Sequence, residues 1–236
     1  MAIAIDASTP ALANSVDTAP TASFTAPAGS LLVALCAFGG GTGTNTIANS
    51  GTALTWAPRV NHQVGEDSGA FAGTVTIFTA VAPTAVARTV TATAASGGSQ
   101  VSLKLLVITG ADVANPVGAV GENHSTTANL TAAAYTSTVA ASRAVGIATD
   151  SNADTTPTSA DVGFGIATIT DDYSGIAVYK AADTATAGSA VTLNFNGTGG
   201  SRTWNWAAIE ILPAVVPFLA PRPLILGQAI NRAAYI

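Results

Sequence analysis

Histidine is the side chain best suited to proton transfer near neutral pH, and the chain contains two, His62 and His124. They lie far apart in the sequence, and neither belongs to an H-E-x-x-H motif. The G-x-S-x-G, C-x-x-C and phosphate-loop patterns are missing as well. Ser and Asp are so frequent that a triad can be imagined around either histidine, so that arrangement has no diagnostic value. We therefore predict that the protein is not an enzyme and needs no cofactor.

The single cysteine, Cys36, is the second residue with potential chemistry, and it excludes an internal disulfide. It lies inside the apolar run "SLLVALCAF", where a free cysteine usually packs as a small buried side chain. The alternative is a reactive thiol, but no Lys or His lies close in the sequence to lower its pKa. We expect Cys36 to be buried.

A third candidate is the segment "DSNADTTPTSAD", which places Asp150, Asn152, Asp154 and Asp161 at positions 1, 3, 5 and 12 of a calcium-loop template. Thr155 stands where that template needs glycine, and an Asp replaces its bidentate Glu. We interpret the segment as a solvated turn, with a calcium site as the alternative, and predict no metal. Asp171 and Asp172 are interpreted as a turn too.

The charge balance argues against several kinds of partner. The chain has 8 basic and 13 acidic residues, a net charge of −5, and only 9% charged residues against 48% hydrophobic ones. No basic cluster indicates nucleic-acid binding. The N-terminus "MAIAIDASTP" lacks the positive region of a signal peptide, and the apolar runs are too short or interrupted for a transmembrane helix. We expect no nucleic-acid partner and no membrane segment.

Alternating apolar and polar residues run along most of the chain, which is typical of β-strands. In "GTVTIFTAV" one face holds Val75, Ile77 and Val81, and "SAVTLNFNG" alternates in the same way, so both are predicted to be half-buried. "SLLVALCAF" and "VSLKLLVITG" are continuously apolar and are predicted to be covered on both faces. Further strands are expected at 2–6, 21–26, 53–60, 87–94, 117–122, 135–140, 143–149, 162–169, 174–181 and 203–212, with Gly- and Asn-rich turns between them.

These patterns predict an all-β fold, a single antiparallel, jelly-roll-like β-sandwich that spans residues 1–212. The predicted core includes Leu32, Val33, Leu35, Cys36, Leu103, Leu105, Val107, Ile209 and Ile211. Trp56, Trp204 and Trp206 are expected to pack in or around this core; a role in stacking on sugars or contacting a partner is the alternative.

The last residues, 213–236, read "PAVVPFLAPRPLILGQAINRAAYI", an apolar segment with four prolines, two arginines and no acid. Exposed contiguous apolar surface usually marks a contact site, so we predict an extended assembly arm that packs on a neighbouring subunit or another protein. The alternative is an arm that folds back and completes its own sandwich. The residues expected to bind the partner are Phe218, Leu219, Arg222, Leu224, Ile225, Leu226, Ile230, Arg232 and Tyr235.

The order of several short segments along the chain resembles that in a β-sandwich unit of tailed-bacteriophage virion proteins, particularly those of actinobacterial phages. These segments are "SFTAPAGSLLVAL", "LTW", "GTVTIFTAVA", "LLVITGADVANPVGA", "YSGIAVYK" and "WNWAAIEILPA", and the resemblance covers most of residues 20–214. Relatives of that kind are minor tail, capsid-associated or decoration proteins. The arm after Pro217 lies outside the resemblance.

The resemblance implies a structural protein of the virion, assembled in the host cytoplasm, which decorates the capsid or forms part of the tail. Its expected partners are other virion proteins and further copies of itself. The alternative function is a lectin-like module that recognises host-surface glycan through exposed aromatic side chains. A hydrolase of surface polymers would need a paired carboxylate site, and no spacing in the chain indicates one.

Overall fold

The computed structural model describes residues 2–39, 45–63, 73–97, 99–127, 129–150, 156–166, 174–196 and 204–215. Every regular element in these ranges is a β-strand, and every paired strand is antiparallel, which confirms the predicted all-β class. The strands are β1 Ala4–Ile5, β2 Ala13–Val16, β3 Thr18–Pro20, β4 Phe24–Thr25, β5 Ser30–Gly39, β6 Thr46–Asn49, β7 Ala57–His62, β8 Thr74–Ala82, β9 Ala87–Arg88, β10 Val90–Thr93, β11 Gln100–Thr109, β12 Val117–Ser125, β13 Asn129–Thr136, β14 Arg143–Asp150, β15 Val162–Ile166, β16 Ser174–Tyr179, β17 Ala190–Asn196 and β18 Trp204–Ile211.

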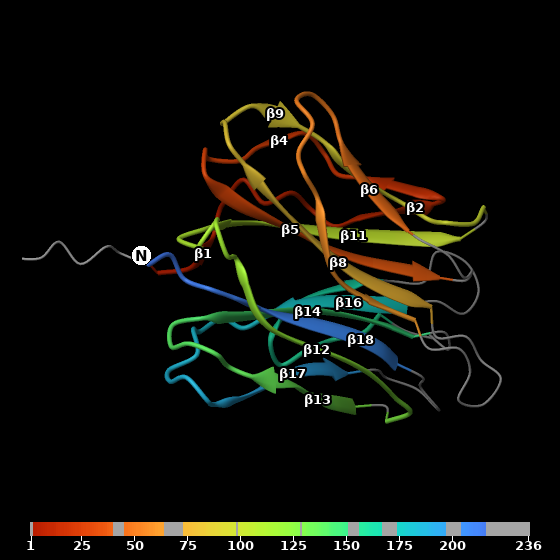
Figure 1. The fold of residues 1–236 in the computed structure, drawn as a ribbon. Coiled ribbons are helices and arrows are strands. Elements are labelled where there is room, and N and C mark those ends of the chain that lie inside the picture. Colours follow the sequence, from red (N-terminus) through yellow and green to blue (C-terminus); the bar gives the residue numbers. More distant parts are fainter. Residues whose placement is uncertain are drawn as a thin grey trace, which may run out of the picture.

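The strands form layers of sheets stacked face to face (Figure 1). The first central sheet has the order β1-β11-β5-β8-β7, with β2 also paired to β11, and the second has the order β12-β18-β14-β16-β15. A first outer sheet, β3-β10-β6, covers the first central sheet, and a second outer sheet, β13-β17, covers the second. A short ladder of β4 and β9 closes one end of the first outer layer.

Three hydrophobic cores separate the layers. The central core lies between the two central sheets and includes Leu35, Ile77, Ile147 and Ile209. A second core lies between the first central and first outer sheets, and a third lies between the second central and second outer sheets. The inner strands of both central sheets, such as β5 and β14, are therefore buried on both faces.

This layering explains the continuous apolar runs. β5 and β11 are buried along almost their whole length, as predicted, because each face contacts a different core. β17 alternates as predicted, since it belongs to an outer sheet with one wet face. The prediction for β8 was wrong: it lies inside the first central sheet, so its threonine-bearing face is buried as well.

The predicted core residues are all buried, and Cys36 is among them. Its burial raises the pKa of the thiol strongly, as expected for an unreactive packing residue. Trp204 and Trp206 are buried in the third core, and Trp56 is partly buried with its indole N–H donating to Asn49 Oδ1 over 3.3 Å. The three tryptophans therefore follow the packing interpretation.

Two predicted elements differ in detail. Residues 137–140, which were expected to belong to a strand over 135–140, instead lie in the turn between β13 and β14. Pro213 and Ala214, which were assigned to the arm, belong to the body, because Pro213 bridges to Ala111 and the Ala214 N–H donates to the carbonyl of Gly110. Asp112 forms an Asx-turn just after β11, since its Oδ1 accepts from the N–H groups of Ala114 and Asn115.

The two halves of the chain share one topology. In each half an edge strand pairs with the last long strand, and the remaining strands follow in the same order, β11-β5-β8-β7 in the first and β18-β14-β16-β15 in the second. β3 paired with β10 in the first outer sheet matches β13 paired with β17 in the second. Both β5 and β14 also begin after a residue with positive φ, Gly29 and Ala141, followed by a serine. The fold is an internal repeat whose copies pack face to face.

Equivalent positions of the repeat can be read from the strand registers. In the first central sheet, one row of Cα partners runs Lys104, Leu35, Ile77 and Val60. In the second, the matching row runs Ala207, Ile147, Ala177 and Phe164, and Glu122 extends it by pairing with Ala207. Lys104 is thus equivalent to Ala207, and Val60 to Phe164.

Candidate cleft between β7 and β12

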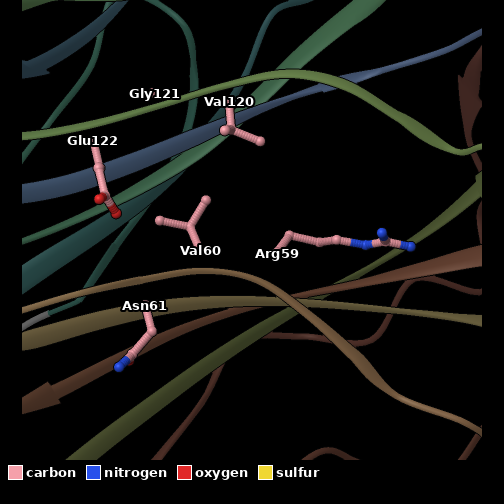
Figure 2. Close-up of a pocket in the computed structure, with 6 residues that line it drawn as sticks. All are labelled: Arg59, Val60, Asn61, Val120, Gly121 and Glu122. Atoms are coloured by element: carbon pink, nitrogen blue, oxygen red, sulfur yellow. The ribbon is translucent and has the colours of Figure 1, made fainter.

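The described surface includes an open cleft where an edge strand of one central sheet faces an edge strand of the other. It has a volume of about 460 Å³ and is lined by Arg59, Val60, Asn61, Val120, Gly121 and Glu122. The first three lie on β7 of the first repeat, and the last three lie on β12 of the second (Figure 2). The cleft is therefore a junction between the repeats.

Strand alternation decides which side chains enter the cleft. Val120 and Glu122 are two residues apart on β12 and lie on the face toward β7, whereas Gly121 faces the carbonyl of Ala134 on β13 so closely that a Cβ would overlap it. Val60 belongs to the central core. Figure 2 shows Val60 and the Glu122 carboxylate directed toward each other from opposite strands.

Arg59 and Asn61 form the rim on the β7 side. The register of β7 shifts between Pro58 and Val60, which makes Arg59 the extra residue of a bulge. Its Nε donates to Thr79 Oγ1 over 2.7 Å. The Asn61 amide points away from β12 and its Oδ1 accepts the Thr76 hydroxyl over 2.7 Å. Both rim residues are fixed by hydrogen bonds to β8.

The two histidines, distant in sequence, belong to this junction. His62 ends β7, and its Nδ1 lies 3.6 Å from Glu122 Oε2, with the His62 side chain 12% exposed and that of Glu122 50% exposed. Burial lowers the pKa of His62; the Glu122 carboxylate acts in the opposite direction and His124 in the same one. The Nε2 of His62 is buried with no hydrogen-bond partner in the described structure.

The predicted partner-binding residues, from Phe218 to Tyr235, lie outside the described residues. In the calcium-template segment, Asn152 and Asp154 also lie outside the described residues. Asp161 is already paired with other residues of the chain. Its Oδ1 lies 2.7 Å from Lys180 Nζ, and its Oδ2 accepts from the N–H and Nδ2 of Asn194. Within the described ranges, no group of three or more His, Cys, Asp or Glu residues is arranged to bind a metal ion.

Comparison of the chain with protein-family models, with curated proteins and with solved structures found no match in any of the three. A search of the described residues for a helix long and apolar enough to cross a membrane found none.

Proposed function

We propose that this chain is a structural protein of a tailed-bacteriophage virion. The layered β body forms a stable unit on the particle, and the C-terminal arm docks it on neighbouring virion proteins or on other copies of itself. This assignment rests on the sequence segments that resemble virion β-sandwiches, on the low charge and on the apolar arm.

The observation that carries the proposal is where the arm leaves the body. All three cores are built from residues between Ile3 and Ile211. The chain then pairs with residues 110–112 through Ala214 and reaches Val215, whose surface is 80% exposed. A strongly apolar segment that begins at the surface of a body with its own cores is suited to bury its side chains on a partner.

The glycan-binding alternative depends on exposed aromatic platforms. Trp204 and Trp206 are buried, and Trp56 is partly buried and hydrogen-bonded through its indole nitrogen. These positions favour packing over sugar stacking for all three tryptophans. The structural role is therefore preferred.

A chain that ends at Ala214 tests the proposal, since Ala214 is the last residue hydrogen-bonded to residues 110–112 in the described part of the chain. We expect it to keep the melting temperature of the full chain but to lose incorporation into particles and self-association, measured by cryo-electron microscopy and by sedimentation. Cooperative unfolding of the shortened chain at a much lower temperature would instead show that the arm completes the body.

A further inference from the structure

We propose that the cleft between β7 and β12 receives Arg222 from the C-terminal arm of a second copy of this chain. The inference rests on the proposed function, in which the arm docks on a neighbour, and it adds the surface and the side chain that make the contact. The two repeats supply an internal control for the cleft.

The two equivalent junctions between the repeats differ in the side chains that occupy them. At one end of the central core, Lys104 and Phe164 meet: the Lys104 ammonium lies 4.0 Å from the centroid of the Phe164 ring and donates to the Pro10 carbonyl over 2.7 Å. Lys104 is only 3% exposed. This end is filled by two large side chains, one of which is a cation.

At the other end, the equivalent positions hold Val60 and Ala207, which are much smaller side chains. The cleft of about 460 Å³ lies at this end, lined by Val60 and by Glu122, the β12 partner of the buried Ala207. The same scaffold is therefore closed by a buried cation and an aromatic ring at one end and left open at the other. Among the residues that the structure describes, none fills the open end as Lys104 and Phe164 fill its counterpart.

The cleft defines the chemistry of an occupant. Val60 and Val120 supply apolar walls, with Val120 52% exposed, and Glu122 supplies a carboxylate that lies 3.6 Å from His62 Nδ1. Arg59 is held on the rim by its hydrogen bond to Thr79. An aliphatic stem that ends in a positive charge satisfies both, because the stem packs on the valines and the charge pairs with the carboxylate. Arginine and lysine side chains have this form.

The arm carries such side chains on an apolar backbone. Residues 213–236 contain Arg222 and Arg232 and no acid, so their charge is complementary to Glu122. Arg222 lies between Pro221 and Pro223, and a residue before proline is held in extended conformation. An extended segment presents one long side chain to a cleft at small conformational cost, whereas Arg232 lacks flanking prolines. Arg222 is therefore the assigned residue and Arg232 its matched control.

The first experiment measures self-association of the full-length chain by sedimentation over a range of concentrations. Glu122→Gln and Arg222→Gln should each weaken association about tenfold or more, and Arg232→Gln, elsewhere in the arm, should weaken it clearly less. Val60→Phe, which imitates Phe164, should also weaken association, and Val86→Phe at an exposed turn is its control. The exchange Glu122→Arg with Arg222→Glu should restore association. Melting temperatures of all variants identify any that are misfolded.

A second experiment separates a neighbour from the same chain. Cys36 is buried, so a cysteine introduced by Glu122→Cys or Arg222→Cys is the accessible thiol. Mixing the two single variants under mild oxidation should give a disulfide-linked pair, and Glu122→Cys mixed with Arg232→Cys should give far less. A disulfide that forms only when both substitutions are in one chain would overturn docking on a second copy.

The outcomes also distinguish this inference from the proposed function. If the chain ending at Ala214 loses association and Glu122→Gln does not, the arm still docks but the cleft is not its receptor. If the full-length chain stays monomeric at every concentration and is nevertheless found in particles, the partner is another virion protein and the inference fails alone. If the chain is missing from particles, the proposed function fails.

Discussion

Replacement of Glu210 should give the clearest test of how the second repeat is held together. This carboxylate is fully buried at the end of β18, and it joins two other segments. Its Oε2 accepts from the N–H of Ala119 on β12 over 2.9 Å and from the Thr138 hydroxyl over 2.7 Å. Its Oε1 accepts from the N–H of Thr138 over 2.9 Å and from that of Val139 over 3.4 Å.

The cost of Glu210→Ala follows from these contacts. Hydrogen bonds to a charged group each contribute about 1.5 to 3 kcal/mol, and a buried donor left without an acceptor costs about 1 to 3 kcal/mol. Thr138 and Val139 belong to an exposed turn, so water can replace part of what they lose. We therefore expect a loss of about 2 to 4 kcal/mol in the free energy of unfolding, measured by urea denaturation at neutral pH.

The same carboxylate should make stability depend on pH. Burial alone raises the pKa of Glu210, but hydrogen bonds from Ala119, Ser142 and Thr138 outweigh it, so the pKa lies below its ordinary value of 4.5. A group with a depressed pKa in the folded state stabilises fully above its unfolded pKa and loses that contribution as the pH falls through its folded pKa. The stability difference between the parent and Glu210→Gln should therefore be constant above about pH 5 and shrink in more acidic solution. A Glu210→Ala variant within about 0.5 kcal/mol of the parent, or a difference that does not change with pH, would refute this reasoning.

Three further predictions concern the core, a close backbone contact and the absence of metal. Leu105→Asp should abolish soluble expression, because the side chain is fully buried and an unpaired buried charge costs several kcal/mol; parental yield in the soluble fraction would contradict this. Gly121→Ala should lower the free energy of unfolding in urea by at least about 2 kcal/mol, since its Cβ would overlap the carbonyl of Ala134; an unchanged midpoint would mean that β12 and β13 separate easily. A calcium chelator should leave the melting temperature unchanged, because Asp161 is already paired with Lys180, and a drop of many degrees would reveal a bound ion.

The sequence predicts the fold class and the deep core because those depend on local patterns. Runs such as "SLLVALCAF" are apolar at every position, which indicates a strand covered on both faces, and β5 is buried in that way. The same logic failed for β8, whose threonines suggested a wet face. Threonine is tolerated in a buried sheet where its hydroxyl finds an acceptor, as Thr76 does with Asn61, and that partner is supplied by a neighbouring strand.

The cleft could not be predicted, because each of its residues has an ordinary local explanation. Glu122 and Val120 alternate on a strand like many other pairs, and His62 lies far from His124 in the chain. Only the stacking of the two central sheets places β7 against β12. The repeat itself is hidden for a similar reason. Between the matching segments 87–111 and 190–214 identities such as Thr89 with Thr192 and Ile108 with Ile211 are few, whereas strand order is retained.

The repeat also clarifies what the arm is relative to the body. In the first repeat, the chain leaves β11 at Thr109, turns through Gly110, and supplies β12 to the edge of the second repeat. In the second repeat, the chain leaves β18 at the equivalent place and continues into the apolar arm. The segment after the last long strand of the first repeat thus joins it to a second unit by packing on that unit. An arm that packs on a unit of another copy would extend the same mode of connection from within one chain to between chains, with its receptor at the junction where the repeats meet.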